Sequence, residues 1–176
     1  AGFTHWAKLN NLKQAAKTMN FLTEHGISSY GELESKLTAV SARRDTAHAE
    51  IKRIESRSAE LALVMKHAGT YRQLKPLYER YRKSNDKEKF LRGHESEIIL
   101  FEAAARELKR LGAVPLPTTE SMKKELANLT AEKERLLAEY KAARTEAQEY
   151  ETVKQNVDAL LTVPKEQEQQ RRHELE

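Results

Sequence analysis

Two long stretches of this chain carry apolar residues at alternating spacings of four and three. In the first stretch every position of the series except Arg44 and Ser58 is apolar, and in the second only Lys133 and Lys154 are not. A repeat of this period is typical of α-helices that wind around each other in a left-handed coiled coil. The first series is Leu33, Leu37, Val40, Arg44, Ala47, Ile51, Ile54, Ser58, Leu61, Met65 and Ala68. The second series is Met122, Leu126, Leu129, Lys133, Leu136, Tyr140, Ala143, Ala147, Tyr150, Lys154, Val157 and Leu161.

The two series favour pairing with each other inside one chain. Residues 69–117 between them are numerous enough to fold into a tip, so a hairpin costs less entropy than a dimer does. We therefore predict an all-α fold, a long antiparallel coiled-coil hairpin with a helical tip. Its register places Leu33 opposite Val157 and Ile54 opposite Leu136.

Two of the three cations at seam positions of this hairpin fall beside small residues. In the predicted register Arg44 lies beside Ala147, and Lys133 lies beside Ser58. The stems of these side chains can pack beside small residues while their charges reach water. Either they fix the register, or the seam merely tolerates them.

Capping residues and breakers divide the chain into four helical regions and a tail. Ser29 followed by Glu32 is a capping box, and Gly26 and Gly112 are placed to end helices. We expect one elongated domain over 1–163, followed by a polar tail over 164–176 that is a marginal helix or disordered. Its parts are an N-terminal helix over 4–25, a long helix over 29–83, tip helices over 86–111 and a return helix over 118–162.

Apolar faces indicate where the shorter helices pack. Leu63 and Val64 widen the apolar face of the long helix, so we expect the helix around Ile98 to cover it. Pro76 should kink or restart the long helix. The N-terminal helix should pack at the hairpin base near Leu37 and Tyr150. Its predicted apolar face consists of Trp6, Leu9, Leu12, Ala16, Met19 and Leu22.

Composition excludes several classes of protein. Charged residues make up 33% of the chain, and there is no cysteine, which removes disulfides and thiolate metal sites and fits a cytoplasmic location. No apolar run is long enough to cross a bilayer, so we expect no membrane insertion. The formal net charge of +4 is too small to indicate nucleic-acid binding by itself.

Catalytic and metal-binding motifs are missing from the sequence. The six histidines are widely separated and show no metal-ligand spacing. No glycine-rich phosphate loop and no nucleophile elbow occurs. We therefore predict no catalytic residue, no metal and no cofactor, and we do not expect this chain to be an enzyme.

One stretch, Tyr71 to Arg92, concentrates positive charge: it holds eight cations against three acids. Basic residues interleaved with Tyr71, Tyr78, Tyr81 and Phe90 can follow a phosphate backbone while rings stack on bases. The favoured alternative is that the tyrosines pack in the core and leave only a basic solvated face. The candidate contact residues are Arg72, Lys75, Arg80, Arg82, Lys83, Lys87, Lys89 and Arg92.

Three runs of sequence carry a family resemblance. They are HWAKLNNLKQAAKTMNFLTEHGISSYGELESK (His5 to Lys36), YRKSNDKEKFLRGHESEI (Tyr81 to Ile98) and QNVDALL (Gln155 to Leu161). Together they resemble the region downstream of the nuclease domain in relaxase/mobilisation proteins of bacterial integrative and conjugative elements. The nuclease domain of that family nicks DNA through a tyrosine and a histidine-bound metal, and no such motif occurs in this chain, so no catalytic residue carries over.

The resemblance implies a non-catalytic accessory domain of a conjugative relaxase that serves plasmid or transposon mobilisation. Its expected partners are DNA and the coupling or secretion proteins of the transfer apparatus. The alternative is a purely structural coiled-coil spacer or oligomerisation module. The sequence leaves the oligomeric state undecided.

Overall fold

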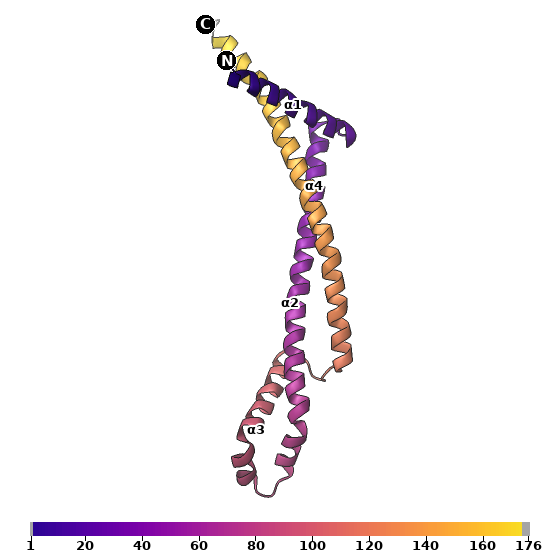
Figure 1. Cartoon of the computed structure of the whole chain (residues 1–176), viewed down its shortest axis with the longest axis vertical. Coiled ribbons are helices and arrows are strands. Elements are labelled where there is room, and N and C mark those ends of the chain that lie inside the picture. Colours follow the sequence, from indigo (N-terminus) through magenta and orange to yellow (C-terminus); the bar gives the residue numbers. More distant parts are fainter. Residues whose placement is uncertain (1, 174–176) are drawn as a thin grey trace. The chain divides into compact units, whose positions relative to one another are not determined.

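The computed structural model describes the backbone of residues 2–173 and the side chains of residues 10–162. These residues form four α-helices and no strand, which confirms the predicted all-α class and its helical hairpin (Figure 1). The helices are α1 (Gly2–Glu24), α2 (Tyr30–Lys83), α3 (Lys87–Arg110) and α4 (Thr119–His173).

The chain divides into two compact units. The terminal unit consists of Ala1–His48 and Leu137–Glu176, and the central unit consists of Ala49–Leu136. Each unit contains a part of α2 and a part of α4. The terminal unit adds α1 to this pair, and the central unit adds α3.

In the terminal unit, α2 and α4 run antiparallel. The Tyr30 hydroxyl donates a hydrogen bond of 2.6 Å to Asp158, and Arg43 forms an ion pair with Glu146. Residue numbers therefore rise along α2 as they fall along α4. Val157 packs against the buried cluster that contains Leu33, in agreement with the predicted register.

In the central unit, two ion pairs show the same antiparallel direction. Lys133 Nζ lies 2.9 Å from Glu55, and Arg57 Nε lies 2.7 Å from Glu125. Lys133 is half-buried at the seam while its ammonium group meets a carboxylate, as a long cation beside a small residue permits.

Each unit has its own apolar core. Three alanines of the terminal unit, Ala47, Ala143 and Ala147, are almost fully buried. Its cluster comprises Ile27, Leu33, Val40, Ala147, Tyr150 and Val153. The cluster of the central unit comprises Leu61, Val64, Ala68, Leu108, Ala113 and Met122. Leu108 of α3 thus covers Val64 as predicted, while Leu63 stays exposed.

The two shorter helices end in the same way. Gly26 and Gly112 both have positive φ, at 60° and 69°, as the sequence predicts for residues that end a helix. The next amides, of Ile27 and Ala113, bond back to the carbonyls of Leu22 and Leu108 at 2.8 and 2.9 Å. Ile27 and Ala113 are themselves buried, so each stop signal also anchors its helix to a core.

A polar side chain caps the start of each of the helices α2, α3 and α4. Ser29 Oγ accepts from the amide of Glu32, and Asp86 and Thr118 accept from the amides of Lys89 and Ser121. The Glu32 carboxylate in turn accepts from the amide and hydroxyl of Ser28, and these hydrogen bonds lower the pKa of Glu32. Helix α3 is interrupted at His94, where φ is −142°.

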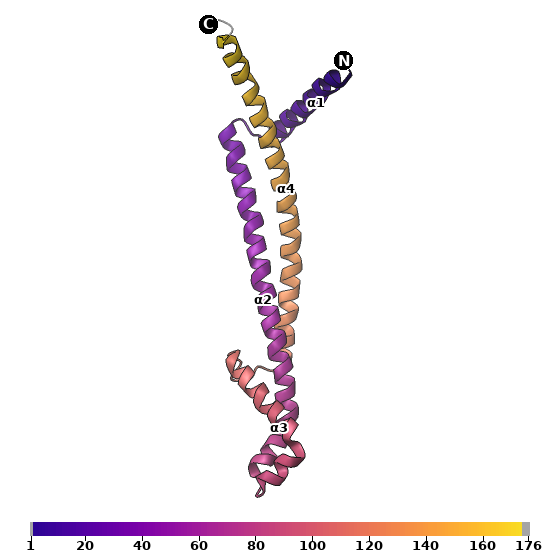
Figure 2. The ribbon, with the colours of Figure 1, turned by 90° about the vertical axis from the view of Figure 1, so that its left-hand side faces the viewer.

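The predicted apolar face of α1 is wrong. Leu12 and Met19 are 68% and 58% exposed, whereas Thr18 is 2% exposed and Phe21 packs against the terminal core. Leu22 does pack there, so the predicted position of α1 beside Tyr150 is confirmed. The face is rotated because the part of α4 that α1 meets carries several polar residues, among them Thr152 and Asn156. Figure 2 shows α1 beside α4. The side chains of Trp6 and Leu9 lie outside the described residues.

One predicted helix limit is also wrong. Helix α4 does not end at 162 but continues through Pro164 to His173, because the Glu, Gln and Arg residues that follow are strong helix formers. The side chains of this tail, and residues 174–176 altogether, lie outside the described residues. Helix α2 runs through Pro76, within its predicted bounds of 29–83, so the helix does not restart there. Tyr71 and Tyr78, on either side of this proline, stack on Phe101 of α3.

Candidate functional site

The basic segment, Tyr71 to Arg92, forms the last turns of α2, a short turn and the first turns of α3, all within the central unit. Both ribbon views place the start of α3 beside the end of α2 (Figures 1 and 2). Ser84 and Asp86 fix the turn between the helices: the Ser84 hydroxyl bonds to Asp86, and Asp86 caps α3. Cations of both helices therefore lie on either side of this turn.

Three of the eight predicted contact residues have partners inside the chain. Arg72 donates to Thr119 Oγ1 at 2.6 Å and to the carbonyl of Pro117, so it holds the connection into α4. Arg92 pairs with Glu88 at 3.0 Å, but both groups are highly exposed, and such a pair contributes little. The Arg80 guanidinium lies 5.8 Å from the centre of the Phe90 ring. Arg72 is thus a structural residue, whereas Arg80 and Arg92 remain accessible.

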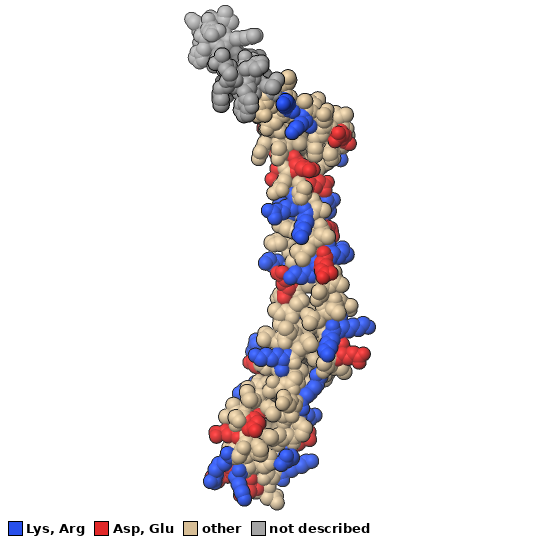
Figure 3. Space-filling model, in the orientation of Figure 1, with Lys and Arg blue, Asp and Glu red and all other residues tan. Residues whose placement is uncertain are grey.

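The other five predicted residues are exposed and form no ion pair within the part of the chain that the structure describes. They are Lys75, Arg82, Lys83, Lys87 and Lys89. Figure 3 shows basic side chains around the end of α2 and the start of α3, among a smaller number of acidic ones. This surface is suited to an anionic partner.

The aromatic rings of the basic segment are packed rather than presented to solvent. Tyr71 and Tyr78 both stack on Phe101, with ring centres 4.8 and 4.2 Å apart, and Tyr81 lies 6.1 Å from Phe90. Burial and the neighbouring carboxylate of Glu102 raise the pKa of Tyr78. These contacts agree with the favoured interpretation, in which the tyrosines pack inside the fold: all three are half-buried, and Tyr71 packs against the buried cluster of the central unit.

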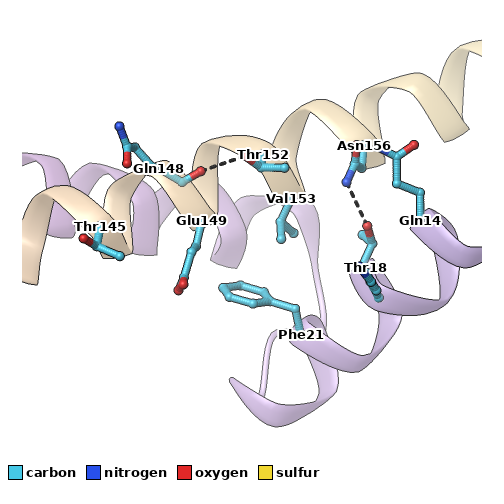
Figure 4. Close-up of a pocket in the computed structure, with 10 residues that line it drawn as sticks. Gln14, Thr18, Phe21, Thr145, Gln148, Glu149, Thr152, Val153 and Asn156 are labelled. Atoms are coloured by element: carbon cyan, nitrogen blue, oxygen red, sulfur yellow. Dashed lines mark hydrogen bonds between the residues drawn. The ribbon is translucent and has the colours of Figure 1, made fainter.

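A second feature, which the sequence reading missed, is a hollow of about 530 Å³ between α1 and α4 in the terminal unit. Figure 4 shows Phe21 and Val153 at its apolar part. Asn156 donates a hydrogen bond of 3.1 Å to the buried hydroxyl of Thr18. The amides of Gln14 and Gln148 also line it. The signal was present in the sequence, since Gln14, Thr18 and Phe21 recur at helical spacing.

The hollow is lined by groups that can bind a polar partner. Its charged lining groups are Lys17 and Glu149, and the remaining polar groups are amides and hydroxyls. Such groups can donate and accept hydrogen bonds. Within residues 10–162 no cluster of three or more potential metal ligands occurs.

Comparison with known proteins gives no further guidance. The chain matches no protein-family model, no curated protein and no solved structure. No helix in the described part of the chain contains a stretch long and apolar enough to cross a membrane.

Proposed function

We propose that this chain is a non-catalytic accessory domain of a conjugative relaxase, and that its basic segment contacts DNA during plasmid or transposon mobilisation in the cytoplasm. The observation that carries the DNA contact is the exposure of Arg82, Lys83, Lys87 and Lys89 around one turn. The family resemblance over His5 to Leu161 supports the assignment to a relaxase. Coupling or secretion proteins of the transfer apparatus are further proposed partners.

The DNA contact is tested by the salt dependence of binding. Each phosphate contact releases about one counterion, so the logarithm of the affinity falls linearly with the logarithm of the salt concentration. A variant with Arg82, Lys83, Lys87 and Lys89 changed to Gln should bind a DNA duplex more weakly. Its salt slope should be shallower by about one for each contact removed.

A matched control separates a local contact from general attraction. Changing Lys123, Lys124, Lys141 and Arg144 to Gln, all exposed on α4, removes the same charge from a different surface. This control should keep the salt slope of the unmodified chain. Equal losses in both variants, or no binding by the unmodified chain at low salt, would remove the DNA part of the proposal.

The second candidate function is a structural spacer or oligomerisation module. It is favoured by exposed apolar side chains in the terminal unit, where Met19 and Leu161 line one shallow hollow and Leu160 is nearby in the sequence. Large exposed apolar residues are typical of surfaces that another protein covers. Light scattering on the unmodified chain and on a Met19→Gln, Leu161→Gln variant tests this function. A dimer that dissociates in the variant supports it, and a monomer in both cases excludes self-association through this surface.

A further inference from the structure

The basic segment offers two kinds of group to a nucleic acid, and the packing of the central unit leaves only one of them usable. Cations bind phosphates, and aromatic rings stack on bases. Sequence spacing alone does not distinguish the two, because both kinds alternate along Tyr71 to Arg92. Their contacts in the fold do distinguish them.

The aromatic rings of the segment are half-buried and contact other parts of the chain. Phe101 is buried, and it stacks with both Tyr71 and Tyr78. Phe90 has Tyr81, His94 and the Arg80 guanidinium around it, at 6.1, 4.8 and 5.8 Å. A base could reach the stacked faces of Tyr71 and Tyr78 only if the core of the central unit opened.

The cations, in contrast, are held outward. The interruption of α3 at His94 separates its first turns, which carry Lys87 and Lys89, from the later turns that carry the buried Ile98 and Phe101. Lys83 lies on the other side of the turn, at the end of α2. All three lysines are exposed, as is Arg82 beside them, and each lysine carries a compact point charge that suits a phosphate.

We infer that the basic segment binds the phosphate backbone of duplex DNA and does not read or stack on bases. This inference rests on the proposed function and specifies its ligand. A duplex carries about one charge per 1.7 Å of its axis, a higher density than a single strand presents. A surface that binds through charge alone therefore prefers the duplex, whereas a base-stacking surface prefers the single strand.

The test compares one sequence as a duplex and as a single strand of equal length, and a second duplex of unrelated sequence, by fluorescence anisotropy over a salt series. The unmodified chain should bind the duplex more tightly than the single strand, with the two duplexes within about threefold of each other, because charge alone carries no sequence information. Lys83→Gln, Lys87→Gln and Lys89→Gln together should make the salt slope shallower by about three. The control with Lys123, Lys124 and Lys141 changed to Gln should leave it unchanged.

Tyr81→Leu tests the rings, with Tyr81→Phe as a milder second variant and circular dichroism as a check that each variant folds. Neither change should alter affinity for the duplex or the single strand by more than about twofold, since backbone contacts do not use the ring. Tighter binding of the single strand, weakened in Tyr81→Leu, would overturn this inference while leaving a DNA-binding domain. Lack of binding to every nucleic acid at low salt would overturn the proposed function, and this inference with it.

Discussion

The helices α1 and α3 each cover a pair of segments from α2 and α4, but they do so with different faces. Helix α3 buries Ile98, Phe101, Ala104 and Leu108, which recur at helical spacing along one side of the helix. Helix α1 buries Thr18 and leaves Leu12 and Met19 exposed. A helix that is apolar along one side does not always turn that side inward.

The surface beneath each helix explains the difference. Helix α3 lies on apolar and aromatic residues of α2, such as Val64, Tyr71 and Tyr78. Helix α1 meets the amide of Asn156 and the hydroxyl of Thr152 on α4, beside an apolar patch around Val153. Buried amides need hydrogen-bond partners, so a polar position on α1 faces them. The partner surface thus decides the orientation of a short covering helix.

The largest effect should come from removing the centre of the α3 contact. Phe101→Ala should lower the free energy of unfolding by about 3–5 kcal/mol, because it removes a buried ring that two tyrosines stack upon. Urea denaturation followed by circular dichroism measures this change. Ile99→Ala on the same helix is the control, since Ile99 is 55% exposed and should cost no more than about 0.5 kcal/mol. Similar losses in both variants would show that α3 does not bury the face described.

A smaller effect is expected at the polar contact of α1. Thr18 and Asn156 share one hydrogen bond, so Thr18→Val and Asn156→Ala should not be additive. The double-mutant cycle in urea denaturation should give a coupling of about 0.5–1.5 kcal/mol. Thr18→Ser, which keeps the hydroxyl, should retain this coupling. A coupling of zero would mean that the hydrogen bond does not orient α1.

The exposed apolar residues of α1 should matter least for stability. Leu12→Gln and Met19→Gln should each change the free energy of unfolding by no more than about 0.5 kcal/mol, because neither side chain leaves an apolar environment. Chemical denaturation of both variants beside the unmodified chain measures the change. A decrease in the free energy of unfolding above about 2 kcal/mol in either variant would mean that the side chain is buried, and that the apolar face predicted from the sequence is correct.

The smallest predicted effect concerns how the stability of the terminal unit depends on pH. Hydrogen bonds from Tyr30 and then Lys154 lower the pKa of Asp158 below its ordinary value of 3.8. A carboxylate whose pKa is lower in the folded state adds stability above the unfolded pKa, and this stability is lost as the pH falls through the folded pKa. NMR titration should show the pKa of Asp158 rising in Tyr30→Phe. An unchanged pKa would contradict the role given to the Tyr30 hydroxyl.

Sequence reasoning succeeded where a single local rule decides the structure. The seam residues from Leu33 and from Met122 define two helices through their period, and Gly26, Ser29 and Gly112 define helix ends through backbone hydrogen bonds. The packing of Tyr71 and Tyr78 followed from their positions at helical spacing. Each of these features depends on residues close together in the chain.

Sequence reasoning failed where distant parts compete. The face of α1 depends on Asn156, which lies far along the chain from Thr18. Within the basic segment, Arg72 could not be separated from the accessible cations, because its partners Pro117 and Thr119 belong to the connection into α4.

The fully buried alanines of the terminal unit limit which amino-acid substitutions this protein can accept during evolution. Ala47, Ala143 and Ala147 can be exchanged only for glycine, which weakens a helix, or for something bulkier, which forces α2 and α4 apart. Leucine positions in the same core have milder replacements, such as methionine or isoleucine. In a set of related sequences these three sites should therefore accept the fewest substitutions, although their side chains are the smallest in the core.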